Sequence, residues 1–113
     1  MKHLIIILLV SVFGMSAQAQ EKSKNAKYSF EVNGNCDQCK KRIEKAAYSV
    51  SGVKMAVWDL ETHQLNVILN EEKTSVAEVK KAIAKVGHDT DEFKATDEDY
   101  TNLHHCCQYE RKP

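Results

Sequence analysis

KYSFEVNGNCDQCKKRIEKAAYSV, residues 27–50, joins a strand pattern to a helix pattern through a loop with two cysteines. In its first part, Tyr28, Phe30 and Val32 share one face of an alternating segment, which is typical of a β-strand. An Asn-Gly-Asn turn follows, and apolar side chains then recur at helical spacing from Asp37 to Val50. These apolar positions are Cys39, Ile43, Ala46, Ala47 and Val50. The stretch therefore predicts the first half of an α+β domain.

The rest of the chain continues this domain with a hairpin, a second helix and a last strand. Residues 53–60 and 64–70 are strand patterns with a short connection, which predicts an antiparallel hairpin. Ser75-Val-Ala-Glu78 is a capping-box pattern that starts a second helix, and Gly87 is a helix terminator. Residues 88–95 then predict a short edge strand. This order is that of a ferredoxin-like βαββαβ fold, with an antiparallel sheet and two helices on one face.

The first 19 residues have the pattern of a secretory signal peptide. A short basic start precedes an apolar run from Leu4 to Phe13, and Ala17-Gln-Ala19 supplies the small residues of a cleavage site. The run is shorter than the roughly 20 residues that a membrane-spanning helix needs. We therefore expect cleavage after Ala19 and a periplasmic or secreted protein without a membrane anchor, which begins with a flexible lead-in at residues 20–26.

Composition places the chain among small, nearly neutral globular domains. The full sequence of 113 residues carries 16 basic and 16 acidic side chains. This balance argues against nucleic acid as a partner, because proteins that bind nucleic acid carry a basic surface. The sequence shows no paired nucleophile and base and no phosphate-binding loop, so we do not expect an enzyme.

Cys36 and Cys39 lie where the predicted loop enters the first helix. The free amides of a helix N-terminus stabilise thiolates, and the basic run at residues 40–42 adds to this field. Two thiolates can converge on one soft metal ion, whereas magnesium and calcium prefer oxygen ligands. The residues alone leave open a local disulfide and a thiol–disulfide oxidoreductase, which also has a CxxC at a helix start. The only proline is Pro113, so the cis-proline of thioredoxin-like enzymes has no counterpart.

With these features the chain resembles the heavy-metal-associated domain family over residues 27–95. The element order, the CxxC at the first strand–helix junction, SGV at 51–53 and AIAKVGH at 82–88 carry the resemblance. The segment NGNCDQC departs from the family motif Gly-Met-x-Cys-x-x-Cys, because it has no methionine and is one residue shorter. The family includes copper chaperones, modules of copper-transporting ATPases and a periplasmic mercury-binding protein.

This resemblance implies that Cys36 and Cys39 are metal ligands. In the family the cysteine pair binds Cu(I), or Hg(II) in the mercury protein, and passes the ion on by thiolate exchange. The partner implied is a metal-transporting ATPase or an efflux component. His88 lies in the loop that in this fold is beside the cysteine loop, and it is a further candidate, either as a ligand or as a residue behind the ligands.

The C-terminal extension, residues 96–113, is predicted to lie outside the core of the domain. It contains a dense group of metal-binding side chains, which are His104, His105, Cys106 and Cys107. Three outcomes stay open for this group: extra ligands that fold over the CxxC, a second weak site, or a disulfide, either vicinal or to Cys36 or Cys39. Three or four thiolates around one ion would suit tightly held Cu(I) or zinc more than rapid transfer.

Three other residues are interpreted as having no part in the site. Met55 and Trp58 are assigned to packing on the second strand. His63 is assigned to a solvated hairpin loop, far from the cysteines.

The sequence therefore predicts an exported protein that acts as a Cu(I) carrier or buffer in metal homeostasis or detoxification. Alternative cargoes are Hg(II), Zn(II) and Cd(II), and the alternative from another functional class is a thiol–disulfide oxidoreductase. We expect a monomer, or a dimer bridged by a shared metal ion.

Overall fold

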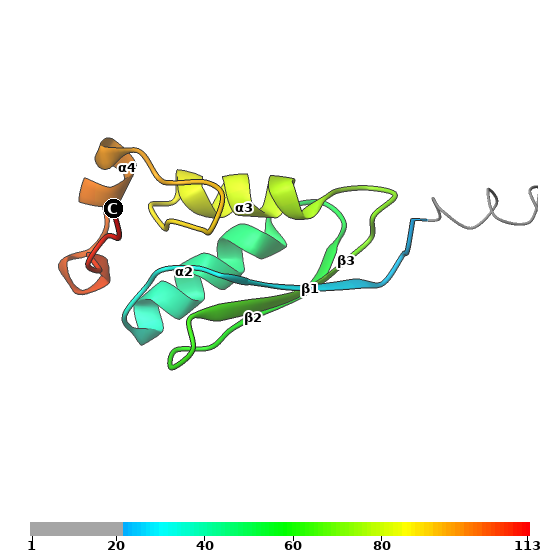
Figure 1. Ribbon diagram of the computed structural model, residues 1–113, viewed down its shortest axis with the longest axis horizontal. Coiled ribbons are helices and arrows are strands. Elements are labelled where there is room, and N and C mark those ends of the chain that lie inside the picture. Colours follow the sequence, from blue (N-terminus) through cyan, green and yellow to red (C-terminus); the bar gives the residue numbers. More distant parts are fainter. Residues whose placement is uncertain (1–21) are drawn as a thin grey trace, which may run out of the picture.

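A computed structural model describes residues 22–113. The predicted signal peptide, its cleavage point after Ala19 and the start of the lead-in lie outside the described residues. Two helices cover one face of a three-stranded sheet, and the short elements of the C-terminal extension lie at one end of the molecule (Figure 1). No helix in the described part of the chain is both long enough and apolar enough to cross a membrane.

The sheet is antiparallel, with its last strand in the centre. Its strands are β1 (Ala26–Glu31), β2 (Val53–Trp58) and β3 (Gln64–Leu69). Both outer strands pair with β3, which gives the order β1-β3-β2. Phe30 of β1 and Trp58 of β2 both lie opposite Leu65 of β3, and all three side chains are buried. Because side chains alternate along a strand, this register turns one face of the sheet toward the helices.

Two amphipathic helices pack on this face. They are α2 (Asp37–Tyr48) and α3 (Val76–Lys85). In α2 the side chains of Cys39, Ile43 and Ala47 are completely buried, and in α3 those of Val79 and Ile83 are. These positions recur every three or four residues, which places them on the helix face that meets the core. The predicted ferredoxin-like order of elements is confirmed up to the end of α3.

The predicted edge strand at residues 88–95 does not form. The segment makes one isolated bridge to the end of β1, between Val32 and Thr90. The Asp89 carboxylate accepts a hydrogen bond from the Ala95 amide at 2.8 Å, and the Thr90 hydroxyl accepts one from an amide three residues further on at 2.9 Å. Because these side chains bind the backbone of their own loop, they compete with a strand ladder.

The C-terminal extension joins the core, contrary to the prediction. It contains the short helix α4 (Asp97–Thr101) and a 3₁₀ turn, η1 (His105–Cys107). Leu103, Cys107 and Tyr109 are buried and belong to the same hydrophobic cluster as the sheet and the helices. The domain therefore has a third layer of packing at the end where α2 begins.

Gly87, at the end of α3, permits this return of the chain. Its φ is +104°, and a Cβ atom there would lie 2.8 Å from the carbonyl oxygen of Asp99 and 2.9 Å from the side chain of Leu103. A side chain at this position would be strained by the backbone conformation and would also collide with the extension.

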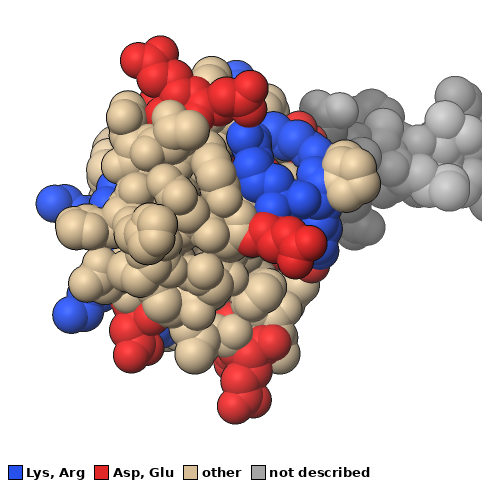
Figure 2. All heavy atoms as spheres, turned by 90° about the vertical axis from the view of Figure 1, so that its left-hand side faces the viewer, with Lys and Arg blue, Asp and Glu red and all other residues tan. Residues whose placement is uncertain are grey.

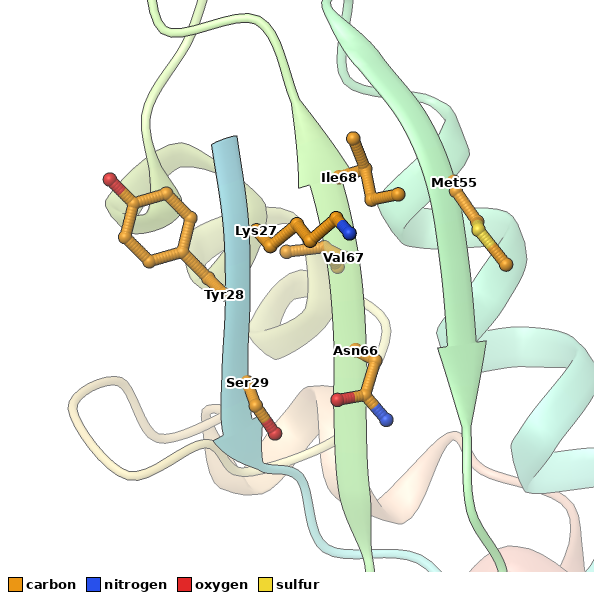
Figure 3. A pocket seen from close by; sticks show the side chains of 7 residues that line it. All are labelled: Lys27, Tyr28, Ser29, Met55, Asn66, Val67 and Ile68. Atoms are coloured by element: carbon orange, nitrogen blue, oxygen red, sulfur yellow. The ribbon is translucent and has the colours of Figure 1, made fainter. Parts of the chain in front are cut away.

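The other face of the sheet is open. It has a shallow pocket, lined by Lys27, Tyr28, Ser29, Met55, Asn66, Val67 and Ile68 (Figure 3). The interpretation of Met55 as a core residue is wrong, because its side chain is 46% exposed. It lies next to buried Ala56, and consecutive residues of a strand point to opposite faces. Trp58, two residues further on from Ala56, is completely buried, as expected.

Candidate metal centre

Cys36 and Cys39 lie at the N-terminus of α2, as predicted. Cys36 is the N-cap residue, with extended backbone, and its carbonyl oxygen accepts a hydrogen bond from the Lys40 amide at 3.1 Å. Cys39, in the first turn, is completely buried, whereas Cys36 is half-buried. Their Sγ atoms are 3.3 Å apart, and both residues are free thiols. The first turn of the helix therefore brings two unbonded sulfurs to one point near the surface.

The cysteine loop lies directly on the Trp58 ring. A Cβ atom at Gly34 would be 3.0 Å from the Cβ of Cys39 and 3.1 Å from the indole, so the absence of a side chain allows this close approach. The indole Nε1 donates a hydrogen bond to the carbonyl oxygen of Val32 at 3.0 Å. The side-chain oxygen of Asn35 accepts a hydrogen bond from the Cys39 thiol at 3.2 Å. Sequence reasoning missed these supporting roles, because packing under a loop leaves no local pattern.

Cys107 reaches the CxxC pair from the other end of the chain. Its Sγ atom is 3.4 Å from that of Cys36, and its side chain is completely buried. Cys106 is exposed, with its Sγ 4.0 Å from that of Cys107 and 3.4 Å from the amide oxygen of Gln38. The sulfurs of Cys36, Cys106 and Cys107 all lie within 4.8 Å of one another. The extension therefore folds over the CxxC, and all four cysteines of the chain gather there as free thiols.

The thiols of Cys36, Cys39 and Cys107 do not have the same acidity. Burial raises the pKa of the Cys36 thiol, but hydrogen bonds from the Cys39 amide and from the Cys39 and Cys107 thiols outweigh it and lower the pKa to about 7. Burial raises the pKa of Cys39. Burial also raises the pKa of Cys107, and the neighbouring thiols of Cys39 and Cys36 add to this effect. Of these three thiols, Cys36 is therefore the first to form a thiolate, and a metal ion that binds would displace the remaining protons.

The predicted histidine candidates are not part of the sulfur cluster. Within residues 22–113, a single group of three or more candidate ligand atoms lies within 4.8 Å of one another. This group contains sulfurs only. His104 and His105 are exposed, beside the cysteines in sequence but outside this group. Metal ligation by His88, His104 or His105 stays a prediction.

His88 lies behind the cysteine loop and is completely buried. Its Nδ1 is 2.8 Å from the carbonyl oxygen of Asn33, and its ring stacks on that of Tyr109 at 5.4 Å between centroids. The Nε2 atom has no hydrogen-bond partner among the described residues. Burial lowers the pKa of the imidazole, so the ring is neutral near pH 7. His88 thus connects the cysteine loop to the C-terminal extension.

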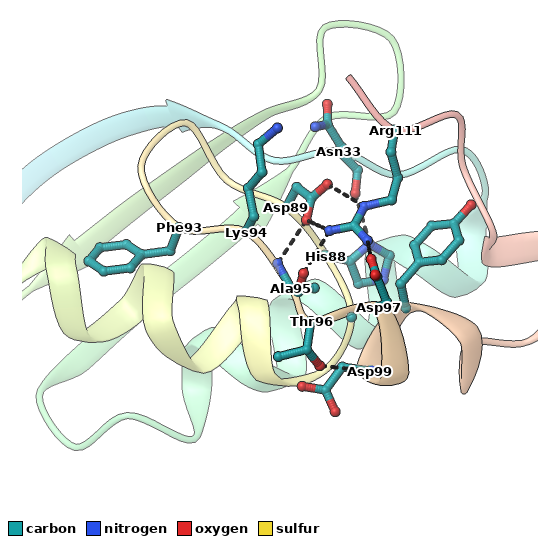
Figure 4. A network of polar contacts seen from close by, with 12 residues as sticks. Asn33, His88, Asp89, Phe93, Lys94, Ala95, Thr96, Asp97, Asp99 and Arg111 are labelled. Atoms are coloured by element: carbon teal, nitrogen blue, oxygen red, sulfur yellow. Dashed lines mark hydrogen bonds and ion pairs between the residues drawn. The ribbon is translucent and has the colours of Figure 1, made fainter. Parts of the chain in front are cut away.

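The C-terminal extension is held in place by a partly buried ion pair. Two guanidinium nitrogens of Arg111 donate to the two carboxylate oxygens of Asp89, each at 2.9 Å, and the same side chain reaches Asp97 at 3.0 Å (Figure 4). The Tyr109 hydroxyl donates to the Gly87 carbonyl oxygen at 2.8 Å and accepts from the Asp89 amide at 2.8 Å. These contacts fasten the last residues of the chain to the loop after α3.

His63 lies at the cysteine end of the molecule, so the interpretation that it is far from the cysteines is wrong. Its ring stacks on Trp58 at 5.5 Å between centroids, and it lines a shallow pocket with Gly34 and Asn35. The topology explains this position: α2 carries the chain away from the cysteine loop, and β2 brings it back. Seen from this end, the centre of the surface is uncharged, and acidic side chains and a group of basic side chains lie around its edge (Figure 2).

Comparison with known proteins agrees with this geometry. The family model described as "Heavy-metal-associated domain" matches residues 29–89, more than half of the chain. The chain is a member of the heavy-metal-associated domain family. A curated relative is the copper chaperone CopZ of Staphylococcus haemolyticus (strain JCSC1435), 36% identical over 55 residues, which are 49% of this chain and 81% of that protein.

Solved structures of similar proteins cover a comparable share of the chain. A CopZ metallochaperone has 32% identity and a TM-score of 0.56, covering 57% of this chain and 98% of its own. The Cu(I)-loaded N-terminal domain of a potential copper-translocating P-type ATPase from Bacillus subtilis has 30% identity and a TM-score of 0.56, covering 58% and 84%. Oxidized MerP from Ralstonia metallidurans CH34 has 31% identity and the same TM-score, covering 58% and 93%.

The matched region contains Cys36 and Cys39 but not the C-terminal cysteines, since the family match ends at residue 89. The part of the chain that brings Cys106 and Cys107 to the site is therefore an addition to the matched domain.

Proposed function

We propose that this protein is an exported carrier or buffer of Cu(I), which it binds through Cys36 and Cys39. The observation that supports this function is the pair of free Sγ atoms, 3.3 Å apart, at the N-terminus of α2 in a heavy-metal-associated domain. Thiolate sulfur is a soft ligand that selects Cu(I) over the harder ions of the cell. The copper chaperone and the Cu(I)-loaded ATPase domain among its relatives point to the same cargo.

The chain's residues suit transfer by ligand exchange. Cys36 is half-buried at the rim, while Cys39 lies beneath it in the core. A thiolate of a partner can therefore approach on the side of Cys36, form a bond to the metal and displace Cys36 before Cys39. The uncharged centre of this end face allows a second domain to come close without burying unpaired charges (Figure 2). The proposed partner is a metal-transporting ATPase or an efflux component.

A competition titration tests this function. The chain from Gln20 to Pro113, which contains every element of the described fold, is reduced and titrated anaerobically with Cu(I) against a chromophoric chelator. We expect one tightly bound ion, and loss of tight binding in the Cys36→Ser/Cys39→Ser variant. Tight binding that survives this double substitution would refute the proposal.

The same titration separates the alternative cargoes. Hg(II), Zn(II) and Cd(II) also accept thiolate ligands, and their ranking against Cu(I) decides which ion is the cargo. A carrier of Cu(I) should bind Cu(I) more tightly than Zn(II) by several orders of magnitude. Zn(II) binding of equal strength would favour the zinc or cadmium alternative.

A thiol–disulfide oxidoreductase is the second candidate function, because the pKa of Cys36, about 7, is that of a reactive thiol. Reduction of a disulfide substrate by the reduced protein, together with failure to compete for Cu(I), would favour it. The proposal expects the opposite result, since a carrier needs no turnover.

Export is proposed from the N-terminal sequence alone. Expression of the full chain in a Gram-negative host, followed by mass measurement of the periplasmic fraction, should find a product that begins at Gln20. Retention of residues 1–19 in the cytoplasmic fraction would contradict it.

A further inference from the structure

We propose that Cys107 is the third thiolate ligand of the metal site, supplied by the chain itself. The site would then consist of Cys36, Cys39 and Cys107, with one ion bound by three sulfurs. This inference rests on the proposed function, and it changes the kind of site. Two thiolates leave room on the ion for a third ligand from a partner protein, whereas here Cys107 of the same chain occupies that third coordination position.

The sulfur positions favour three-coordinate binding over linear binding. The Cys36 sulfur is 3.3 Å from that of Cys39 and 3.4 Å from that of Cys107. With a metal–sulfur bond of about 2.3 Å, sulfurs around a three-coordinate ion are about 4 Å apart, and those of a linear pair about 4.6 Å apart. The thiols would have to separate further for a linear ion than for a three-coordinate one, and the loop lies tightly on Trp58.

The contacts of the extension hold Cys107 at this position from both sides. On its N-terminal side, Leu103 packs into the core against Gly87. On its C-terminal side, the Tyr109 hydroxyl donates a hydrogen bond to the Gly87 carbonyl oxygen and accepts one from the Asp89 amide. The Cys107 amide itself donates to the carbonyl oxygen of His104 at 2.8 Å, which closes the 3₁₀ turn. The sulfur is therefore fixed by packing, hydrogen bonds and, through Arg111, an ion pair.

The burial of Cys107 could be explained without a metal ion, because a free cysteine packs well as a small apolar residue. Packing alone, however, does not require the sulfur to contact another sulfur. Cys107 has both CxxC residues as neighbours: its Sγ contacts Cys36, and its carbonyl oxygen lies 4.0 Å from the Cys39 sulfur. An apolar core residue would leave the CxxC pair facing a hydrocarbon group instead.

Cys106 is the competing donor in the adjacent position, because its sulfur lies within 4.8 Å of those of Cys36 and Cys107. It is exposed and its sulfur is directed toward Gln38, at the rim of the cluster. Substitution of Cys106 removes one thiol from the same turn of the extension without removing a buried contact. The two neighbouring cysteines therefore separate ligation by Cys107 from a general effect of losing a thiol near the site.

A third internal thiolate changes the order of metal transfer. The incoming thiolate of a partner forms its bond to the ion as the bond from Cys107 breaks, and the released Cys107 thiolate takes a proton from water. The ion keeps its charge, so no oxidant or reductant is needed. Transfer then depends on how readily the extension leaves the site, and the extension acts as an internal competitor of the partner.

X-ray absorption of the Cu(I)-loaded wild-type chain from Gln20 to Pro113 counts the sulfurs directly. We expect three sulfur ligands in the wild type and in Cys106→Ser, and two in Cys107→Ser. Two sulfurs in the wild type, at the shorter distance of a linear site, would overturn the inference. The sulfur count of the wild type does not depend on how a substitution affects folding.

The competition titration supplies the second test. Cys107→Ser should weaken Cu(I) binding by at least about tenfold, since loss of even an outer partner of a metal site typically costs this much. Cys107→Ala should do the same, and Cys106→Ser should weaken binding less than either, with circular dichroism confirming that each variant is folded. Equal affinities in all three variants would overturn the inference but not the proposed function, which fails instead if the wild type cannot compete for Cu(I) or if binding survives Cys36→Ser/Cys39→Ser.

Discussion

Single residues behind the cysteine loop determine where the two thiols lie. Trp58 supports the loop from below, Asn35 accepts a hydrogen bond from the Cys39 thiol, and His88 contacts the carbonyl oxygen of Asn33 at the start of the turn. None of these residues supplies a sulfur atom that could hold the ion. These residues fix the loop before a metal ion binds. Their contribution can therefore be measured as the free energy of unfolding of the metal-free protein.

We expect acid to destabilise the metal-free protein partly through His88. Burial lowers the pKa of its imidazole, and the charge of Arg42 acts in the same direction, while the Asn33 carbonyl and the Asp89 carboxylate oppose them. In the unfolded chain this pKa returns to about 6.5. Between the lowered pKa and about 6.5 the folded state binds fewer protons than the unfolded state. The free energy of unfolding is therefore retained above this window and falls as the pH drops through it.

Urea unfolding at about pH 7.5 and about pH 5 measures this contribution. The variant His88→Gln, which keeps an amide donor for the Asn33 carbonyl, should lose less stability between the two pH values than the wild type does. His105→Gln, at an exposed position, should follow the wild type. An identical loss in all three proteins would show that His88 has no part in the pH dependence.

Among the elements, the end of α3 decides whether the extension can reach the site. Gly87→Ala should destabilise the protein by about 1–3 kcal/mol, because its φ of +104° is strained for alanine. In addition, the new Cβ would lie 2.8 Å from the Asp99 carbonyl oxygen and displace the extension. We therefore expect lower stability in urea and faster alkylation of Cys107 than in the wild type.

Gly52→Ala is the matched control for this substitution. Gly52 has the same φ of +104°, but its Cβ would meet the side chains of Lys73 and Thr74, away from the extension. It should lower stability while leaving the alkylation rate of Cys107 unchanged. Equal alkylation rates in the two glycine variants would mean that Gly87 does not control the position of the extension.

The sequence alone was sufficient to predict those elements whose sequence signals lie within a few residues of one another. The helix start at Ser75 was visible as a capping residue, and its side chain accepts the expected amide hydrogen bond. The segment after Gly87 was not predictable in the same way. Its alternating residues resemble a strand, but Asp89 and Thr90 use their side chains to bind their own loop. That competition appears only when the loop is folded.

At the scale of the whole molecule, the candidate site combines two parts with different origins in the sequence. The CxxC was predictable because its spacing, its place before a helix and the surrounding element order all occur within the matched region. The position of Cys107 was not, because it depends on contacts between residues far apart in the chain, such as the pairing of Arg111 with Asp89. From the sequence alone, the four donors of the extension were equivalent; folding buries Cys107 and leaves its neighbours exposed.

The extension should therefore contribute to folding as well as to the site. A chain that ends at Ala95 corresponds to the domain predicted from the sequence, but it lacks Leu103, Cys107 and Tyr109 of the shared core. Loss of one buried leucine side chain typically costs about 2–5 kcal/mol, so we expect the truncated chain to lose at least about 3 kcal/mol of stability in urea. A chain that ends at Arg111 keeps every buried contact and loses two exposed contacts of Lys112, which are its pair with Glu31 and the hydrogen bond that its carbonyl oxygen accepts from Lys94. Exposed pairs of this kind are worth little.

These two truncations decide whether residues 96–113 are an appendix or part of the domain. If the chain that ends at Ala95 unfolds at the same urea concentration as the one that ends at Arg111, the extension is dispensable for the fold, and the packing of Leu103 and Tyr109 contributes nothing measurable. If it unfolds earlier, as expected, the extension stabilises the end of the molecule that holds the cysteines. Displacement of Cys107 by a partner would then also cost part of the stability of the fold, so that the metal-binding and folding equilibria of this protein are linked.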